Sequence, residues 1–292
     1  MLKVKRVLTL LCILMLLAGC HRKEPLTVDT KSINVLDDIS EELNGDIHSA
    51  EYMVIDMSDF HILYKKDADR QMYPASLTKL VTLDTMLHLC EDLNDLSYVS
   101  DSQVRWLISE DASLAYIQRD YPYTIRDLLY ALVLPSGADA AFALWNYCEE
   151  RNLDLIEEMN RLCGDLGCTG SHFVNSTGLH DGDHYTTLDD LFLVVMDILK
   201  NEEGRKILET LHYTLEDGTI VYTTLGVAFR NHEFRVLGGK TGYTPEAGQN
   251  IIALCKDRGK SYLVMTANAY GSYYLNQYWH YDDVETVFEH LR

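Results

Sequence analysis

Positive charge is scarce in this sequence. Lysine and arginine together number 25 against 45 aspartates and glutamates, which leaves a formal net charge of −20 over 292 residues. Such a balance argues against a nucleic-acid partner, because phosphate backbones attract basic surfaces. Long charge runs, low-complexity tracts and internal repeats are also missing. The hydrophobic content of 47% is typical of a globular protein with a large core.

Closely spaced cysteine pairs are absent too. None of the seven cysteines forms a C-x-x-C motif, which argues against a structural zinc site. An odd number of cysteines follows residue 20, namely Cys90, Cys148, Cys163, Cys168 and Cys255. At most two disulfides can form among these five, and the sequence leaves the pairing open. We interpret most of them as buried free thiols.

The sequence also lacks an apolar run long enough for a membrane span. A basic N-terminus precedes apolar residues 7–17, whereas a transmembrane helix needs about 20 apolar residues. We therefore expect a secretory signal peptide over residues 1–19. Its last residues and the following cysteine, LAGC, resemble a bacterial lipobox, which implies cleavage before Cys20 and lipidation of that cysteine. An uncleaved membrane anchor is the alternative.

These N-terminal features predict where the protein resides and how it is divided. Residues 20–48 are polar and predict a spacer that follows the lipid anchor. A single domain is expected over residues 49–292. We expect this domain to lie on the extracytoplasmic face of the cell membrane, held there by the N-terminal lipid.

Strand patterns lie at both ends of this domain, with helix patterns between and after them. Residues 51–56 and 60–66 are β-rich and predict a hairpin, and residues 250–256 and 261–269 predict another. Helical apolar spacing covers residues 124–133, 139–150, 152–167, 186–200 and 282–291. We therefore expect an α+β fold in which both chain ends contribute to one antiparallel sheet beside a helical lobe.

A serine and a lysine stand three residues apart in the sequence PASLTK. If Ser76 opens a helix, this spacing places its hydroxyl and the amine of Lys79 on one face. A serine hydroxyl is a poor nucleophile until a base takes its proton. Lysine can be that base at neutral pH when burial or a nearby cation, such as Lys240, lowers its pKa. The ordinary alternative is a helix cap beside a solvated lysine.

Two further motifs follow in the chain. Ser136 lies in LPSGADA, and the triplet Lys240-Thr241-Gly242 lies in GGKTGYT. S-x-x-K, a central serine motif and K-T-G together are the signature of penicillin-binding proteins and class A β-lactamases. Ser136 alone could cap a helix, and the triplet alone could be a turn. All three motifs in this order are rare by chance.

With their flanks, these motifs resemble the serine D-alanyl-D-alanine carboxypeptidases, the low-molecular-weight penicillin-binding proteins. The resemblance extends from about Tyr52 to the C-terminus and includes the stretch MNRLCGDLGCTGSHFVNSTGLHDGDHYTTLDDL. It implies the fold shared by β-lactamases and DD-peptidases, with neither a cofactor nor a metal. It also implies two partners, a peptidoglycan stem peptide ending in D-Ala-D-Ala and β-lactams that acylate the enzyme.

The resemblance implies catalytic roles for three side chains. Ser76 would attack the carbonyl of the penultimate D-alanine and form an acyl-enzyme. Lys79 would take the proton of Ser76, and Ser136 would pass a proton to the leaving amine. Water would then release the shortened peptide.

The same resemblance implies that the strand with the K-T-G motif binds the substrate. Lys240 and Thr241 would hold the terminal carboxylate of the substrate, and Gly242 would leave the strand edge bare for the peptide. The backbone N–H groups of Ser76 and Tyr243 would form the oxyanion hole.

Two alternatives stay within this fold. A catalytically weak or inactive penicillin-binding protein is one, because Ala138 stands where the family usually has asparagine. A β-lactamase is the other, and class A enzymes use a loop glutamate to hydrolyse the acyl-enzyme. The corresponding loop, residues 168–186, contains aspartates but no glutamate, so we expect slow release of bound β-lactam.

A metallohydrolase is the alternative from a different class. The sequence LHDGDHY offers ligand-type side chains, His180, Asp181, Asp183 and His184. Their position in a glycine-containing loop also suits a turn.

Overall fold

The computed structural model describes residues 43, 47–225, 229, 232–271 and 277–292. The expected signal peptide, the lipidation site Cys20 and most of the spacer lie outside these residues, so those expectations stay predictions. Among the helices in the described part of the chain, none has the length and apolar character needed to cross a bilayer.

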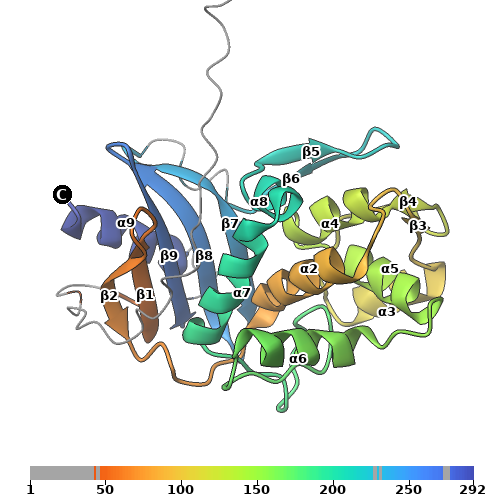
Figure 1. Ribbon diagram of the computed structural model, residues 1–292, viewed down its shortest axis with the longest axis horizontal. Coiled ribbons are helices and arrows are strands. Elements are labelled where there is room, and N and C mark those ends of the chain that lie inside the picture. Colours follow the sequence, from red (N-terminus) through yellow and green to blue (C-terminus); the bar gives the residue numbers. More distant parts are fainter. Residues whose placement is uncertain (1–42, 44–46, 226–228, 230–231, 272–276) are drawn as a thin grey trace, which may run out of the picture. The chain divides into compact units, whose positions relative to one another are not determined.

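A five-stranded antiparallel sheet carries the strands of both chain ends (Figure 1). Its strands are β1 (Glu51–Asp56), β2 (His61–Lys66), β7 (Arg235–Thr244), β8 (Gly248–Asp257) and β9 (Lys260–Ala269). Their order in the sheet is β2-β1-β9-β8-β7. Both predicted hairpins are confirmed, and the pairing of β1 with β9 confirms that early and late strands share one sheet.

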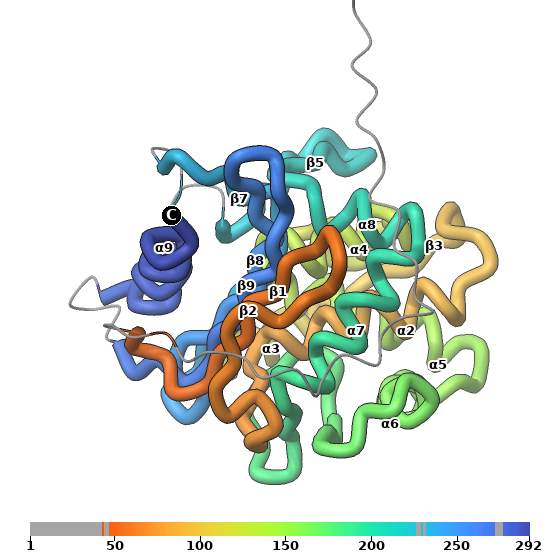
Figure 2. The backbone as a smooth tube through the Cα atoms, turned by 60° about the vertical axis from the view of Figure 1, so that its left-hand side comes forward, coloured from red at the N-terminus to blue at the C-terminus, as the bar shows by residue number. Residues whose placement is uncertain are grey.

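Helices cover both faces of the sheet (Figure 2). One face carries the helical lobe, and the other carries α9 (Trp279–His290). The lobe contains the 3-10 turn η2 (Ala75–Leu77) and the helices α2 (Thr78–Leu89), α3 (Asp101–Ser109), α4 (Ile125–Val133), α5 (Ala138–Glu149), α6 (Leu155–Leu166), α7 (Leu188–Lys200) and α8 (Glu202–Leu208). Two short strand pairs complete it, β3 (Leu96–Ser97) with β4 (Tyr123–Thr124) and β5 (His212–Thr214) with β6 (Ile220–Tyr222).

The run of apolar residues in β1 follows from these two layers. Side chains alternate between the faces of a strand, so a sheet covered on both faces needs apolar residues at every position. Tyr52 and Val54 pack in one cluster with Phe288 of α9. The intervening Met53 and Ile55 are equally buried and point to the opposite face.

Some details of the fold differ from the predictions. Ser76 does not open an α-helix but lies in η2, two residues before α2 begins. The sequence patterns also missed α8, which follows α7 after a single residue, Asn201, whose side chain caps it. All five cysteines beyond residue 20 are buried and free, which confirms their interpretation as thiols.

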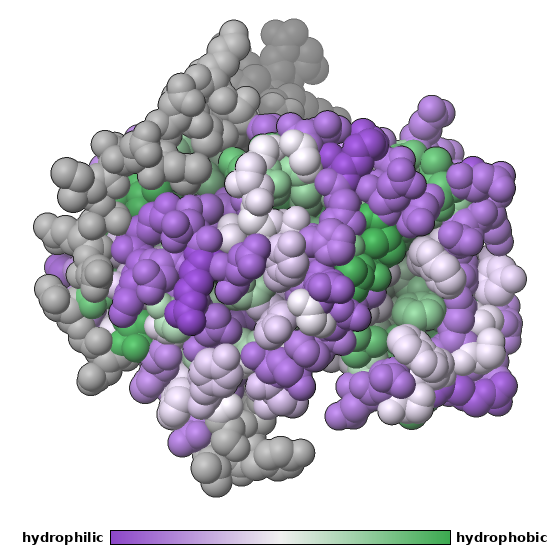
Figure 3. All heavy atoms as spheres, turned by 90° about the horizontal axis from the view of Figure 1, so that it is seen from below, coloured by the Kyte–Doolittle hydropathy of each residue, from purple (hydrophilic) through white to green (hydrophobic). Residues whose placement is uncertain are grey.

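The surface reflects the acidic composition. The face in Figure 3 is largely hydrophilic, and hydrophobic atoms gather mainly in a hollow on the side of the helical lobe.

Candidate active site

Ser76 and Lys79 meet where the sheet adjoins the helical lobe. Because η2 runs directly into α2, the two side chains stay on one face, and Lys79 Nζ lies 3.0 Å from Ser76 Oγ. Lys79 Nζ also donates a hydrogen bond to the carbonyl of Thr177 over 2.6 Å. Lys79 is 2% exposed, whereas Ser76 is partly accessible. The predicted pair is therefore a reachable hydroxyl beside a buried amine.

Burial prepares the lysine to act as a base. It lowers the pKa of Lys79 to about 7, although the charge of Asp139 opposes this shift. At neutral pH a large fraction of this amine is thus unprotonated and can accept a proton. Burial is the main cause of the lowering, and Lys79 also interacts through its charge with Lys240, the nearby cation that the sequence offered as a possible cause.

A second pair joins Ser136 to Lys240. Lys240 Nζ donates to Ser136 Oγ over 2.8 Å and to the carbonyl of Thr241 over 2.7 Å. Ser136 is not a helix cap, because α5 begins at Ala138 and Gly137, its N-cap, provides no side chain. Lys240 is fully buried, and this burial, followed by the charge of Lys79, lowers the pKa of Lys240.

The turn that carries Ser76 is enclosed by two glycines. A Cβ atom on Gly242 of β7 would lie 2.8 Å from the Pro74 carbonyl oxygen and 3.1 Å from Ser76 N. A Cβ on Gly178 would lie 1.8 Å from the Ala75 oxygen. Ala75 itself has a φ of 47°, in the left-handed region. Glycine at both positions therefore lets β7 and the loop after α6 approach the backbone of Ser76.

The outer edge of β7 carries the remaining predicted residues. Within the sheet β7 pairs only with β8, so its other edge faces the helical lobe. Thr241 is partly exposed, and its Oγ1 lies 2.9 Å from Thr224 Oγ1. Tyr243 is exposed at the end of the same strand. The sequence analysis missed Thr224, since it lies outside every motif and reaches the site only through tertiary packing.

Asp139 is a second residue whose role the sequence did not reveal. Its buried carboxylate accepts hydrogen bonds from the N–H groups of Ala115 and Ile117, over 2.8 and 3.2 Å. These bonds fix the segment between α3 and β4 against the start of α5, next to Ser136. Asp139 is therefore a positioning residue for Ser136.

The side chains of LHDGDHY take structural positions. His184 Nδ1 accepts from the N–H of Val174, and its Nε2 lies 2.7 Å from Thr78 Oγ1. Burial lowers the pKa of His184 to about 4, so the ring is neutral at pH 7. His180 packs edge-on against Tyr73 instead. Of the described residues, those that converge with metal-ligand spacing lie elsewhere, on α2 and α7.

The family model and the curated relatives that match this chain all point to the same family. The sequence model of the D-alanyl-D-alanine carboxypeptidase family matches residues 38–270. The chain is 28% identical over 218 residues to D-alanyl-D-alanine carboxypeptidase DacF of Bacillus subtilis, covering 72% of this chain and 54% of that protein. It is 27% identical to the D-alanyl-D-alanine carboxypeptidase of Streptomyces sp. K15, covering 68% of this chain and 73% of that protein. The chain thus spans about half the length of the Bacillus relative.

Solved structures share the fold. The Streptomyces K15 DD-transpeptidase superposes with a TM-score of 0.73 at 24% identity, covering 84% of this chain and 97% of that chain. Penicillin-binding protein D2 of Listeria monocytogenes, in its ampicillin-bound form, gives a TM-score of 0.69 at 24% identity, covering 84% and 98%. The expected DD-peptidase-like fold is confirmed.

Proposed function

Because this chain belongs to the family of D-alanyl-D-alanine carboxypeptidases, we propose that it removes the terminal D-alanine from peptidoglycan stem peptides. It does so as a serine peptidase through an acyl-enzyme on Ser76, and β-lactams acylate the same hydroxyl. One observation carries the proposal, the convergence of Ser76 with Lys79 and of Ser136 with Lys240 from three separate parts of the chain.

Acylation begins at the partly exposed hydroxyl. Lys79, whose pKa is lowered to about 7, takes the proton as Ser76 Oγ attacks the carbonyl carbon of the penultimate D-alanine. The N–H groups of Ser76 and Tyr243 stabilise the resulting oxyanion. Removal of one such donor typically costs about 2.7–4 kcal/mol of transition-state stabilisation.

Breakdown of the tetrahedral intermediate expels the terminal D-alanine. The carbon–nitrogen bond breaks, and the departing amine takes a proton from Ser136. Ser136 regains a proton from Lys240 Nζ, its hydrogen-bond partner at 2.8 Å, and the proton that Lys79 took from Ser76 restores Lys240. Water then attacks the ester, the shortened peptide leaves as a carboxylic acid, and Ser76 recovers its proton.

The substrate lies along the outer edge of β7 beside Gly242, with its carboxylate toward Thr241. Lys240, which the resemblance places at this carboxylate, is buried, and its Nζ is bonded to Ser136 Oγ and the Thr241 carbonyl. We assign the direct contact to the hydroxyls of Thr241 and Thr224, with the amine of Lys240 beneath them. Recognition of this carboxylate accounts for a requirement for a free C-terminus.

We place the enzyme outside the cytoplasm, bound to the cell membrane by lipid on Cys20. The sequence LAGC after a short apolar run supports this location. It brings the domain to peptidoglycan, its proposed substrate.

The test is incubation of the purified protein with a peptide ending in D-Ala-D-Ala and measurement of released D-alanine. Release should persist in chelator and should disappear in Ser76→Ala, while Ser102→Ala, on the surface of the helical lobe, serves as the matched control. A fluorescent penicillin should add one adduct, on the peptide that contains Ser76. Labelling that survives Ser76→Ala contradicts the assignment of the nucleophile. Labelling without D-alanine release favours the non-catalytic alternative.

A further inference from the structure

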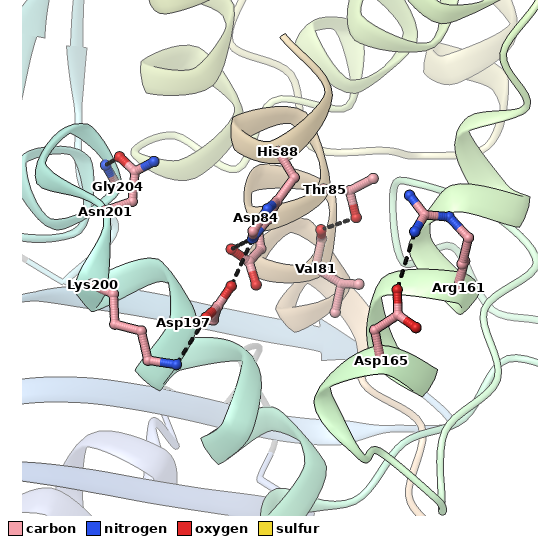
Figure 4. Close-up of polar contacts among 10 residues, drawn as sticks. All are labelled: Val81, Asp84, Thr85, His88, Arg161, Asp165, Asp197, Lys200, Asn201 and Gly204. Atoms are coloured by element: carbon pink, nitrogen blue, oxygen red, sulfur yellow. Dashed lines mark hydrogen bonds and ion pairs between the residues drawn. The ribbon is translucent and has the colours of Figure 1, made fainter. Parts of the chain in front are cut away.

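Three ligand-type side chains gather further along α2, away from Ser76 (Figure 4). Asp84 and His88 are four residues apart on α2, so they share one face, and Asp197 reaches them from α7. One oxygen or nitrogen atom from each of the three lies within 4.8 Å of the other two. Asp84 lies roughly 7.5 Å and His88 roughly 14 Å along the helix axis from Lys79, and neither contacts Ser76 or Lys79 in the described structure.

The burial of Asp84 without hydrogen-bond partners needs an explanation. Its side chain is 1% exposed, and neither carboxylate oxygen has a hydrogen-bond partner in the described part of the chain. His88 Nε2 lies 3.9 Å from Asp84 Oδ1. Buried carboxylates without partners are costly and rare, so two open oxygens inside a ligand cluster point to an absent binding partner.

The charges around the cluster suit a divalent cation. Asp197 Oδ2 lies 2.7 Å from His88 Nε2, and Asp197 Oδ1 accepts from Lys200 Nζ over 3.0 Å. A dication at this cluster would balance the two carboxylates of Asp84 and Asp197. Lys200 is 41% exposed and is free to turn toward solvent when Asp197 binds a metal.

The cluster is open to solvent on one side. A groove of about 260 Å³ is lined by His88 and Asp197 and, on α6, by Arg161 and Asp165. Arg161 forms an ion pair with Asp165 over 3.1 Å, so its positive charge is neutralised on the α6 side of the groove. Water in this groove can reach the coordination positions that the three side chains leave open.

We propose that Asp84, His88 and Asp197 bind one divalent transition-metal cation of the Zn²⁺ class, with water from the groove completing its coordination. One imidazole nitrogen and two carboxylate oxygens match the ligands that Zn²⁺ accepts, and three protein ligands plus water is a common zinc arrangement. The metal joins α2, which carries Lys79, to α7. This proposal does not depend on the proposed carboxypeptidase activity.

Zinc binding to the chelator-stripped, full-length protein tests the proposal. Equilibrium dialysis should find one high-affinity Zn²⁺ per chain, and excess Zn²⁺ should raise the melting temperature by about 5 °C or more. Asp84→Asn, His88→Gln and Asp197→Asn should each weaken Zn²⁺ affinity about tenfold or more. Asp165→Asn, on the opposite wall of the same groove, is the matched control and should bind like the wild type.

The decisive readout is the zinc-dependent part of the melting temperature. Asp84→Asn removes a buried ionisable group, so its stability without zinc will change for reasons unrelated to metal. His88 is 54% exposed, and its replacement should leave the fold intact. A wild-type chain that binds no zinc overturns the proposal, as does equal binding by the wild type and all three variants.

Discussion

Lys240 Nζ donates a hydrogen bond to Ser136 Oγ over 2.8 Å, across 104 positions of sequence. The bond links the outer strand of the sheet to the segment that leads into α5, so it joins the two halves of the active site. Because both groups are buried, removal of one partner leaves the other incompletely satisfied.

Ser136→Ala should therefore slow acylation by penicillin without unfolding the protein. Leaving a buried donor without its partner costs about 1–3 kcal/mol, which corresponds to a rate roughly 5- to 150-fold lower. Stopped-flow or gel-based labelling measures the rate. The control is Ser113→Ala, since Ser113 contacts this region through its backbone oxygen. Equal rates in the two variants would remove Ser136 from the mechanism.

The pH dependence of acylation should report Lys79. Below a pKa of about 7 the amine is protonated and cannot take the proton of Ser76, so the second-order rate should fall about tenfold per pH unit at low pH. Above that pKa the rate should level off. A profile that is flat between pH 5 and 9 would show that another group is the base. Lys79→Ala should give no labelling at any pH in this range.

Gly242→Ala should impair acylation through sterics alone. Its added methyl group would press on the Pro74 oxygen at 2.8 Å and on Ser76 N at 3.1 Å, so the nucleophile's turn must shift. We expect a rate at least tenfold lower, since displacements of about 1 Å in a site can cost 100-fold. Gly182→Ala, where a Cβ meets nothing within 4 Å, is the control and should behave like the wild type. Similar rates for both variants would contradict the close approach of β7 to Ser76.

Ala138→Asn tests the departure from the family pattern. Ala138 begins α5, two residues after Ser136, and its side chain offers neither donor nor acceptor. Asparagine there should restore a hydrogen bond near Lys79 and raise acylation by a D-Ala-D-Ala peptide about tenfold or more. D-alanine release under single-turnover conditions measures this. A slower variant would mean that the pocket is shaped around alanine and accepts a different substrate.

Cys20→Ala tests the location. The variant should stay uncleaved by the lipoprotein-processing peptidase and should lack a diacylglyceryl mass in intact mass spectrometry. The wild type should fractionate with membranes, because two or more acyl chains give firm attachment. A wild-type chain without lipid, beginning at another residue, would rule out this anchor.

Local patterns predicted the parts of the fold that depend on neighbouring residues. The hairpin of β8 and β9 was predictable because apolar runs flank Asp257 and Gly259, and α7 was predictable from its apolar spacing. The 3-10 turn at Ser76 was not, since it depends on the left-handed Ala75, which is held between segments distant in sequence. Sequence spacing thus located the pair of Ser76 and Lys79 but not the backbone strain beside it.

Only those residues of the candidate site that belong to a sequence motif were predictable. Ser76 and Lys79 are neighbours in sequence, and the order of the three motifs indicated that Ser136 and Lys240 belong to the same site. The carbonyl of Thr177, which accepts from Lys79, could not be predicted because every residue has a carbonyl. The sequence also could not predict contacts that arise only when helices pack together, such as that between Asp84 and Asp197.

The pairing of β1 with β9 has a consequence for biosynthesis. Asn268 Nδ2 donates to Glu51 Oε2 across 217 positions of sequence, and β1 has no second sheet neighbour until β9 exists. Of the five-stranded sheet, a chain leaving the ribosome can form only the hairpin of β1 and β2, which is marginal on its own. Closing such a long loop is also slow. The central sheet therefore cannot be completed until β9, close to the C-terminus, has been made.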